Sequence, residues 1–434
     1  MNADSKEPAF RQDTPPASKV HPVDYVPGKP IELLHCDAQI DLDGKTLNGD
    51  LTVFQNLSPP ELYWECVVPD VTGIGEGRAE IRADFNAVGD VYRISSLKSA
   101  FGGGFFGEGI EFGGEHPLTQ VVFYLPGMPQ VVDVVLEADE WIVKLQPNRT
   151  YKSNEHDIPH AEVELSGIGV IRKKDGSKFK RSEAKHLLRV LKLFISIAFL
   201  KWTSPTLIYG ASDNCKESWI WWADSEINLM KESYGWVDEW DDEDDQLKNA
   251  FSGFWSLCNK DEWIDHLELV ATWMIQASCE TINKSSAVVI SQIPIELLSS
   301  VVIVTDNKIL SAHDFEKLTT AGRFRILACF CEIPLQFPEE LETIAKLAKH
   351  LECEAPEFLV KLRNSLIHPS STIRDSCRKL EIDIEVVWHE SSQLYCWFTN
   401  LILLRLFGHS GTFASRLYRY PSEFKTDKVP WESK

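Results

Sequence analysis

From its apolar runs, the sequence is not expected to span a lipid bilayer. Its most apolar stretch, Leu193 to Leu200, contains Ser196 and is far shorter than the roughly 20 residues that a membrane-spanning helix needs. Residues 1–28 are polar and proline-rich, without the basic and then apolar order of a secretion signal. We therefore expect a cytoplasmic protein that does not bind a membrane.

A regular cysteine framework is also missing, although the chain has ten cysteines. Thiols in a chain of this size without a secretion signal are expected to stay reduced. One set of side chains could be considered as metal ligands: Cys329, Cys331, His350 and Cys353. The first pair lacks the spacing of zinc ligands and falls in an apolar helical stripe, so buried thiols are the better prediction. We expect no metal and no cofactor.

The motifs of common nucleotide- and metal-dependent enzymes are absent: the sequence has no P-loop, no H-E-x-x-H and no nucleophile elbow. Gly102, Gly104 and Gly107 fit the spacing of a dinucleotide-binding fingerprint. The residues that follow are themselves glycine-rich and cannot open a stable helix, which that fingerprint requires. A flexible loop is predicted there, and its tip could still meet a ligand.

Positive charge is scarce, with 44 Lys and Arg against 65 Asp and Glu and a formal net charge of −21. Proteins that coat nucleic acid without sequence preference need a basic surface to neutralise the phosphates. The acidic balance of this chain excludes that class of protein. The run 238–245 holds seven acids in eight residues and is predicted to be a solvated linker. Between Lys361 and Lys379 the balance reverses, with five basic residues and the single acid Asp375. A nucleic-acid site would have to be local.

The residues that are present divide the chain into a β-rich and an α-rich part, an α+β fold of two or three domains. Residues 1–28 are predicted to be a flexible N-terminus, and 29–180 an antiparallel β domain, either a sandwich or a barrel. Turns are expected at Asp43-Gly44 and Asn48-Gly49. Residues 181–260 are predicted to form a helical, tryptophan-rich connection, and 261–434 an all-α domain.

Apolar residues recur at helical spacing through the second half of the chain. Helices are predicted at 183–200, 261–282, 295–304, 314–331, 339–350, 357–368 and 382–407. Gly408 is placed to cap the last of them. Nine of the fourteen tryptophans lie between residues 201 and 280. We expect them to be buried in a core or interface rather than exposed for base stacking.

Arg363, Asn364 and His368 are the residues that point most directly to chemistry. Asn364 and His368 are i, i+4 neighbours on one helix face, and Pro369 predicts that the helix ends at His368. Unpaired carbonyls at a helix C-terminus favour a protonated imidazole, which suits a proton-exchanging histidine. An apolar stripe makes the segment a core-facing helix: Phe358, Leu359, Leu362 and Leu366.

Two other arginine-to-histidine pairs have a similar spacing. Arg149 and His156 lie in a polar stretch that no helix holds rigid. Arg181 and His186 lie at the start of an apolar helix, where the helix dipole disfavours a histidine cation. Neither pair is predicted to be a site.

The segment 357–369 resembles the HEPN family of ribonucleases, and in particular the ApeA-type HEPN proteins of phage defence. Residues 397–408 and 411–416 also resemble theirs. The specific similarity covers about residues 310–420. Residues 30–310 agree only in layout, a β-containing region before a helical HEPN module.

The resemblance implies a metal-independent endoribonuclease that acts on tRNA or another host RNA in anti-phage defence or abortive infection. Arg363 would stabilise charge on the scissile phosphate, and Asn364 would orient the phosphate or the histidine. His368 would act as general base on the ribose 2′-OH or as acid to the leaving oxygen. One motif per chain implies a homodimer through the HEPN domain. The N-terminal domain would sense a phage-derived trigger or restrain the nuclease.

Other interpretations stay open. A non-catalytic HEPN scaffold or regulatory dimer would suit the acidic composition, although a scaffold has no need of an intact Arg363-Asn364-His368 set. In that case His368 would merely cap a helix and Arg363 would be a surface ion-pair partner. A weaker possibility is ligand sensing by the β domain, with the helices passing on the signal.

Overall fold

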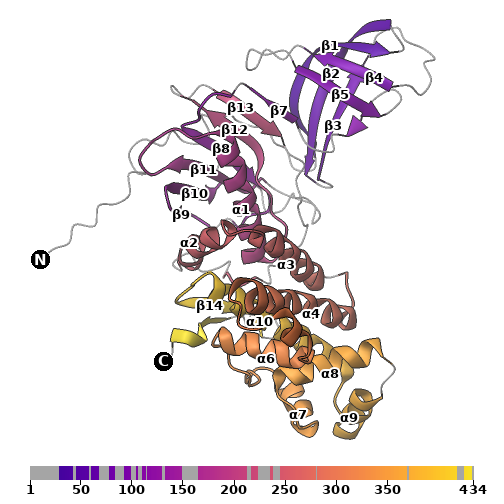
Figure 1. Ribbon diagram of the computed structural model, residues 1–434. Coiled ribbons are helices and arrows are strands. Elements are labelled where there is room, and N and C mark those ends of the chain that lie inside the picture. The colour runs from indigo at the N-terminus through magenta and orange to yellow at the C-terminus, as the bar shows by residue number, and fades with distance from the viewer. Residues whose placement is uncertain are drawn as a thin grey trace, which may run out of the picture. The chain divides into compact units, whose positions relative to one another are not determined.

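The chain forms two compact units, described here from a computed structural model (Figure 1). The first unit comprises residues 1–135, 140–188 and 203–229, and the second comprises 136–139, 189–202 and 230–434. A β-rich N-terminal half followed by a helical C-terminal half confirms the predicted α+β class. The structure describes residues 29–42, 45–57, 60–67, 78–83, 92–98, 104–105, 110–113, 115–129, 132–148, 165–212, 217–222, 235–237, 245–279, 281–368, 371–417 and 425–432.

The first sheet of the N-terminal half is antiparallel, with the strand order β5-β4-β1-β2-β3-β6. Its strands are β1 (Ile31–Leu42), β2 (Lys45–Leu57), β3 (Pro60–Val67), β4 (Arg78–Ala83), β5 (Tyr92–Lys98) and β6 (Gly104–Phe105).

One of the two predicted hairpin turns agrees with the register of this sheet. Leu42 pairs with Lys45, so β1 and β2 are joined by the two residues Asp43-Gly44, which themselves lie outside the described residues. The prediction of a turn at Asn48-Gly49 is wrong, because both residues lie inside β2. The ladder with β1 continues through them, and cross-strand pairing there outweighs the local turn propensity.

The second sheet is also antiparallel, with the strand order β7-β13-β12-β8-β11-β10-β9. Two of its strands, β12 and β13, come from residues predicted to be a helical connection. β12 is buried at every position and pairs with β8, near the middle of the sheet. The strands are β7 (Ile110–Phe112), β8 (Gln120–Leu125), β9 (Val134–Ala138), β10 (Trp141–Pro147), β11 (Gly167–Lys173), β12 (Thr206–Ala211) and β13 (Glu217–Trp222).

The helices follow the predicted pattern, with several corrected boundaries. The helix predicted at 295–304 begins earlier, at Lys284, and α4 passes into a six-residue π-helix, Val301–Asp306. The helix predicted at 314–331 is two helices, α5 and α6. The helices are α1 (Arg181–Phe199), α2 (Gln246–Cys258), α3 (Trp263–Ser278), α4 (Lys284–Ser300), α5 (Ala312–Glu316), α6 (Thr320–Phe330), α7 (Glu342–His350), α8 (Ala355–Ile367), α9 (Thr372–Leu380) and α10 (Ile384–Leu406).

Three elements of the second unit, α9, β14 (Thr412–Ser415) and β15 (Lys425–Lys428), were not predicted. The short helix α9 has only three apolar residues, Ile373, Cys377 and Leu380, a helical stripe too short for the sequence analysis to pick out. After α10 the chain forms a two-stranded antiparallel sheet from β14 and β15. The C-terminal part is therefore helical but not all-α.

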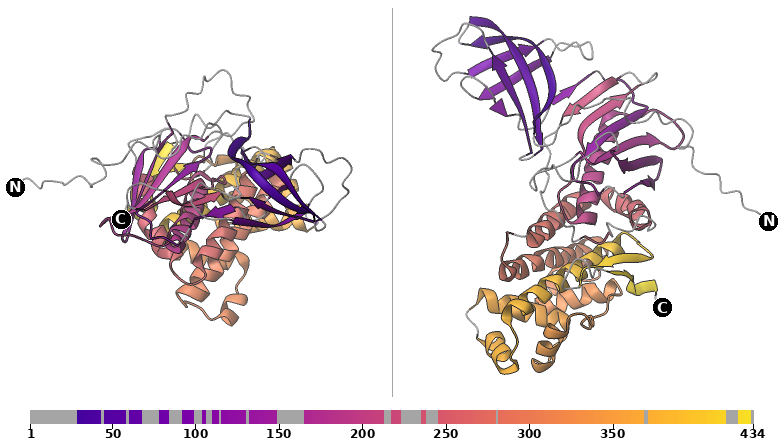
Figure 2. Two further views of the ribbon diagram at one scale, coloured as in Figure 1. Left: turned by 90° about the horizontal axis from the view of Figure 1, so that it is seen from above. Right: turned by 180° about the vertical axis from the view of Figure 1, so that it is seen from behind.

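The core of the helical unit is built around α10 and α4, which run side by side (Figure 1, Figure 2). α10 also packs against α2, α6 and α7, and α4 also packs against α3, α6 and α8. Phe398 on α10 meets Phe324 on α6 edge to face, with ring centroids 4.9 Å apart. The expectation that no stretch is long and apolar enough to cross a membrane is wrong for one helix of the described residues, Lys284–Asp306, but 61% of its most apolar part is buried inside the protein. Such burial is that of a core helix.

Gly408 ends α10 as predicted. Its φ of +65° is left-handed. Its N–H donates to the Arg405 carbonyl at 3.1 Å, and the His409 N–H donates to the Leu404 carbonyl at 2.9 Å. These two bonds form a Schellman motif, which satisfies the last carbonyls of the helix.

Replacing Gly408 by alanine is expected to lower the free energy of unfolding by about 1 kcal/mol, because alanine disfavours a positive φ. No atom lies within 4 Å of the position that a Cβ would take, so strain rather than a clash sets the cost. Urea denaturation measures it. Gly408→Asn, which tolerates the left-handed region better, should lose less. Equal stability of the alanine variant and the wild type would contradict this role of the cap.

Candidate functional site

The helix α8 places the three predicted residues at its C-terminal end. Phe358, Leu359 and Leu362 are fully buried and fix one face of the helix in the core, whereas Leu366, the fourth residue of the predicted stripe, is only half-buried. The helix ends at Ile367. This confirms the predicted end of the helix.

His368 is the C-cap of α8, with extended backbone (φ −109°, ψ 137°). This is the conformation expected of a residue before a proline. Its backbone N–H still donates to the Asn364 carbonyl at 2.8 Å. The side chain is exposed beside the unpaired carbonyls of the last turn. The imidazole is therefore open to a ligand from solvent.

Arg363 and Asn364 are in direct contact. The Arg363 Nη1 donates to the Asn364 Oδ1 at 3.1 Å, and Asn364 is exposed. Among the described residues no hydrogen bond joins the His368 imidazole to either of them. The structure thus brings the arginine and the amide together and places the histidine one helical turn beyond the amide, about 6 Å further along the axis. A single chain leaves the histidine separate from the guanidinium.

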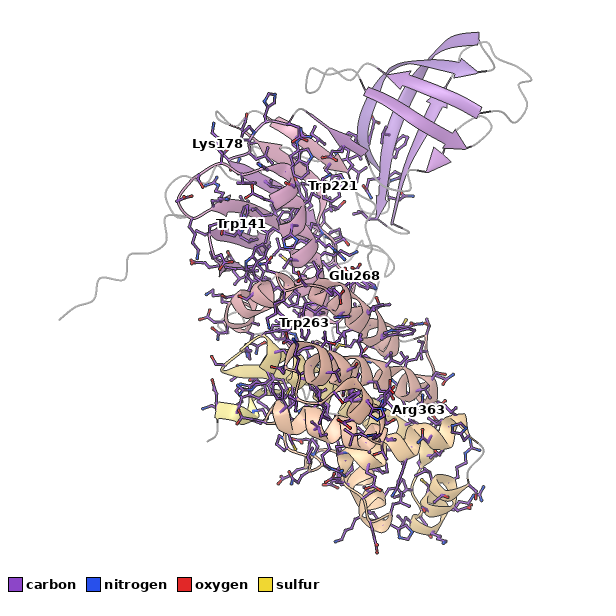
Figure 3. The ribbon with its side chains drawn as sticks, in the orientation of Figure 1. Trp141, Lys178, Trp221, Trp263, Glu268 and Arg363 are labelled. Atoms are coloured by element: carbon purple, nitrogen blue, oxygen red, sulfur yellow. The ribbon has the colours of Figure 1, made fainter. Side chains whose placement is uncertain are left out.

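The guanidinium of Arg363 has an inner side that sequence patterns did not indicate. Its Nε is buried and has no hydrogen-bond partner among the described residues. Nearby, the Tyr395 hydroxyl donates to Gln292 Oε1 at 3.1 Å, and the Gln292 amide donates to the Glu296 carboxylate. Burial raises the pKa of Tyr395, and the positive charge of Arg363 opposes that rise. Arg363, labelled in Figure 3, thus bonds to an exposed amide and acts electrostatically on the buried Tyr395 hydroxyl, which is hydrogen-bonded to α4.

The local basic charge is smaller than the sequence suggests. Lys361 is paired with Glu357 at 2.9 Å, and Arg378 with Asp375 at 3.1 Å. Two of the five basic side chains between residues 361 and 379 are thus offset by acids. Arg363, Arg374 and Lys379 form no ion pair within the described part of the chain. They supply the positive charge around the end of α8.

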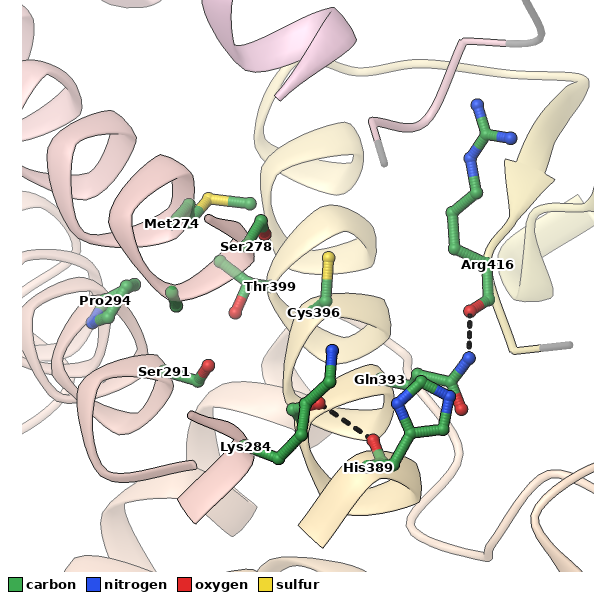
Figure 4. A pocket seen from close by; sticks show the side chains of 12 residues that line it. Met274, Ser278, Lys284, Ser291, Pro294, His389, Gln393, Cys396, Thr399 and Arg416 are labelled. Carbon is green, nitrogen blue, oxygen red and sulfur yellow. Dashed lines mark hydrogen bonds between the residues drawn. The ribbon is translucent and has the colours of Figure 1, made fainter. Parts of the chain in front are cut away.

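A second candidate site, which sequence patterns did not indicate, is a pocket of about 90 Å³ in the helical unit (Figure 4). It is lined by one face each of α3, α4 and α10, and by Arg416 after β14. On α10 the lining positions recur at helical spacing: His389, Ser392, Gln393, Cys396 and Thr399. The helical spacing of these polar residues is visible in the sequence. It does not tell whether that face of α10 lies toward solvent or toward a cavity.

The other candidates from the sequence have structural explanations or fall outside the described residues. Arg181 is buried at the start of α1, with its Nη1 3.7 Å from the Glu111 carboxylate, so it serves an ion pair. Arg149 and His156, together with Gly102, Gly107 and the acidic run up to Asp244, lie outside the described residues. Gly104 is in β6, paired with Trp64.

The cysteine prediction holds only in part. Cys331 is buried, which raises its pKa to about 12. Cys353 is half-buried and Cys329 is exposed, so the prediction of buried thiols is wrong for Cys329. Cys329 lies on the face of α6 that points away from the core. The apolar stripe in the sequence did not show on which face of the helix Cys329 falls. Within the described residues no group of three or more His, Cys, Asp or Glu side chains could hold a metal ion.

The tryptophans between residues 201 and 280 are mostly core residues. Five are almost completely buried, which confirms the prediction for them: Trp219, Trp222, Trp236, Trp255 and Trp263. They offer no exposed faces for base stacking.

Comparison with known proteins places both candidate sites in a region similar to a phage-related protein. The model of the YopA C-terminal domain matches residues 260–426, and that of the YopA central domain matches 117–233. The SPbeta prophage-derived uncharacterized protein YopA of Bacillus subtilis (strain 168) is 22% identical over 276 residues. The match covers 62% of this chain and 58% of that protein's length. No solved structure matches the chain. None of these names carries an activity, so the HEPN resemblance stays a prediction.

Proposed function

We propose that the chain is a metal-independent endoribonuclease with Arg363, Asn364 and His368 as its catalytic residues. The observation that carries the proposal is the end of α8. There an exposed histidine at a helix C-terminus follows, one turn on, an exposed amide that is hydrogen-bonded to an arginine. These are the groups that phosphodiester cleavage by a neighbouring hydroxyl needs.

The chemistry follows from the properties of the three side chains. In RNA the ribose 2′-OH is the nucleophile, so the protein has to move a proton and stabilise charge. The His368 imidazole would take the 2′-OH proton or deliver one to the 5′ leaving oxygen. The Arg363 guanidinium would stabilise the phosphorane-like charge, and the Asn364 amide would orient the phosphate. The products would be a 2′,3′-cyclic phosphate and a 5′-hydroxyl.

A complete site is proposed to form from two chains. His368 lies beyond hydrogen-bonding contact with Arg363 of its own chain, and the net charge of the protein is −21. Two α8 ends facing each other across a twofold would double the local positive charge and bring each histidine near the other arginine. Ile367, which is 44% exposed beside His368, supplies apolar surface for such a contact. The homodimer rests on this geometry and on the HEPN resemblance.

The biological role we propose is RNA cleavage in the cytoplasm during phage infection, as in abortive infection, with tRNA or another host RNA as the substrate. The resemblance to ApeA-type proteins and the prophage origin of the YopA relative support it. The N-terminal β-rich part would sense a phage-derived trigger or restrain the nuclease. No cofactor is part of the proposal.

The second candidate is a non-catalytic helical scaffold or regulatory dimer. One observation favours it: Arg363 is half-buried beside the Tyr395–Gln292–Glu296 network, a place where an arginine contributes to packing as well as charge. In this view the histidine is an exposed helix cap.

RNA cleavage in the presence of EDTA separates the two functions. The full chain, incubated with total RNA and excess EDTA, is expected to produce fragments that end in a 2′,3′-cyclic phosphate, at a rate unchanged by the chelator. The fragments are detected by end-specific ligation. If phage-infected cell extract is added and the RNA still stays intact, the scaffold is the correct function. Cleavage that stops in EDTA would contradict the metal-independent mechanism.

A further inference from the structure

We propose that the pocket between α3, α4 and α10 is a binding site for a small organic anion, a phosphate ester or a hydroxylated carboxylate. The site is separate from the end of α8, and the proposal does not rest on ribonuclease activity. It rests on the pocket's shape, on the charge of its lining, and on the hydrogen-bond donors that it leaves unused.

Three helices each turn one face toward the pocket. α3 contributes Met274 and Ser278, which are i, i+4 neighbours. α4 contributes its first residue, Lys284, and Ser291 two turns later. The face of α10 runs from His389 through Thr399. Because each helix is anchored by its apolar side in the core, the walls of the pocket are fixed before a ligand arrives.

The charge of the lining is positive in a strongly acidic protein. Among the described residues that line the pocket there is no Asp and no Glu, although the chain has 65 of them. Lys284 forms no ion pair with any described residue, so its ammonium is available to a ligand. His389 adds a second group that can carry positive charge. An anion is the ligand that this lining favours.

Arg416 contributes charge without using its side chain as a ligand. Its Nε donates to the Gly235 carbonyl at 2.8 Å and its Nη2 to the Val237 carbonyl at 2.7 Å. Figure 4 shows the guanidinium pointing away from the other lining side chains, while its backbone carbonyl accepts from Gln393 at 3.1 Å. The guanidinium still makes the field at the pocket more positive, and it opposes the rise of the Cys396 pKa.

The donors and acceptors define the ligand further. The hydroxyls of Ser278 and Ser291 have no hydrogen-bond partner among the described residues, so they can donate to an anion. The hydroxyls of Ser392 and Thr399 donate to the carbonyls of their own helix at 2.8 Å, which leaves their lone pairs for a ligand hydroxyl. A phosphate or carboxylate with a neighbouring hydroxyl meets both requirements.

The volume and the remaining walls limit the size of the ligand. A pocket of about 90 Å³ admits a small molecule rather than a nucleotide. Met274 and Pro294 offer apolar contact for a short carbon chain. Burial raises the pKa of Cys396 to about 11, so this thiol stays protonated and lines the wall without acting as a nucleophile.

Calorimetric titration of the full chain tests the proposal with three probes that share a three-carbon chain: glycerol 3-phosphate, glycerate and neutral glycerol. At least one of the two anions is expected to bind saturably, with one site per chain, and glycerol is not. Lys284→Gln should weaken binding of that anion about tenfold or more, because a charge-assisted hydrogen bond is lost. Lys284→Arg should keep the affinity within about threefold.

A matched variant controls for overall charge. Lys346 is exposed on α7 and does not line the pocket, so Lys346→Gln should bind like the wild type. Lys284 is exposed as well, and its substitution is expected to leave the fold intact. Two results overturn the proposal: no saturable binding of either anion up to about 10 mM, or equal affinity in the wild type and Lys284→Gln. Equal binding of glycerol would overturn the assignment of an anion.

Discussion

Replacing His368 by alanine is expected to slow RNA cleavage by about 10²–10⁴-fold, the typical contribution of a general acid or base. The free energy of unfolding should change by less than about 1 kcal/mol, because the imidazole is exposed and interacts mainly with the dipole of α8. Single-turnover cleavage rates and urea denaturation of the same preparations measure the two effects. A large loss of rate with an unchanged fold is the result expected of a catalytic residue.

His350 provides the matched control for this variant. It is an exposed histidine in the last turn of α7, so His350→Ala removes the same side chain from a similar helix end. That variant should cleave RNA like the wild type. Arg363→Ala should slow cleavage as strongly as His368→Ala, but it should also destabilise the protein, because Arg363 is half-buried. Full cleavage by His368→Ala would remove His368 from the mechanism.

The substitution Gly253→Ala is expected to destabilise the helical unit by about 3 kcal/mol or more, although alanine is the better helix former. Gly253 lies in α2, and a Cβ there would be 1.7 Å from the Phe407 carbonyl oxygen, at the end of α10. The Phe407 carbonyl is backbone and cannot rotate away like a side chain, so the two helices would have to move apart. Thermal unfolding of the full chain should show a transition lowered by about 10 °C.

Gly322→Ala in α6 is the matched control for the clash. A Cβ at Gly322 would meet only the Thr319 hydroxyl at 3.2 Å and the Leu318 side chain at 3.9 Å. The gain in helix propensity should then dominate, with a change between zero and about 1 kcal/mol of stabilisation. If both glycine variants were equally stable, the close approach of α2 and α10 would not be a determinant of this fold. That approach also sets the position of α10, which carries Tyr395 and the pocket wall.

The parts of the fold that could be predicted are those in which local pattern and packing agree. α10 is long, apolar and followed by a glycine with positive φ, so its existence and its end were both predictable. α9 was missed because its helical stripe, Ile373, Cys377 and Leu380, is only three residues long in a strongly charged segment. β12 and β13 were missed because a short apolar run does not distinguish a strand from a buried helix, and their outer partners β8 and β7 lie far away in the sequence.

The candidate site shows the same division. Pro369 and the apolar stripe of α8 predicted the position of His368, because both act within one helix. The burial of the Arg363 Nε beside Tyr395 was not predictable, since it depends on which helix covers that face of α8. The pocket was hidden for a related reason. Its walls are three helix faces that become one surface only after tertiary packing.

The most direct test of the central proposal is the effect of a single 2′-deoxy substitution in the RNA. After mapping a cleavage position for the full chain in EDTA, the same oligonucleotide is prepared with deoxyribose at the nucleotide 5′ to the cut. Because the proposed nucleophile is the 2′-OH of that ribose, cleavage at this position should disappear while other positions are still cut. Continued cleavage at the substituted position, or no RNA cleavage by the triggered protein, would contradict the proposed mechanism.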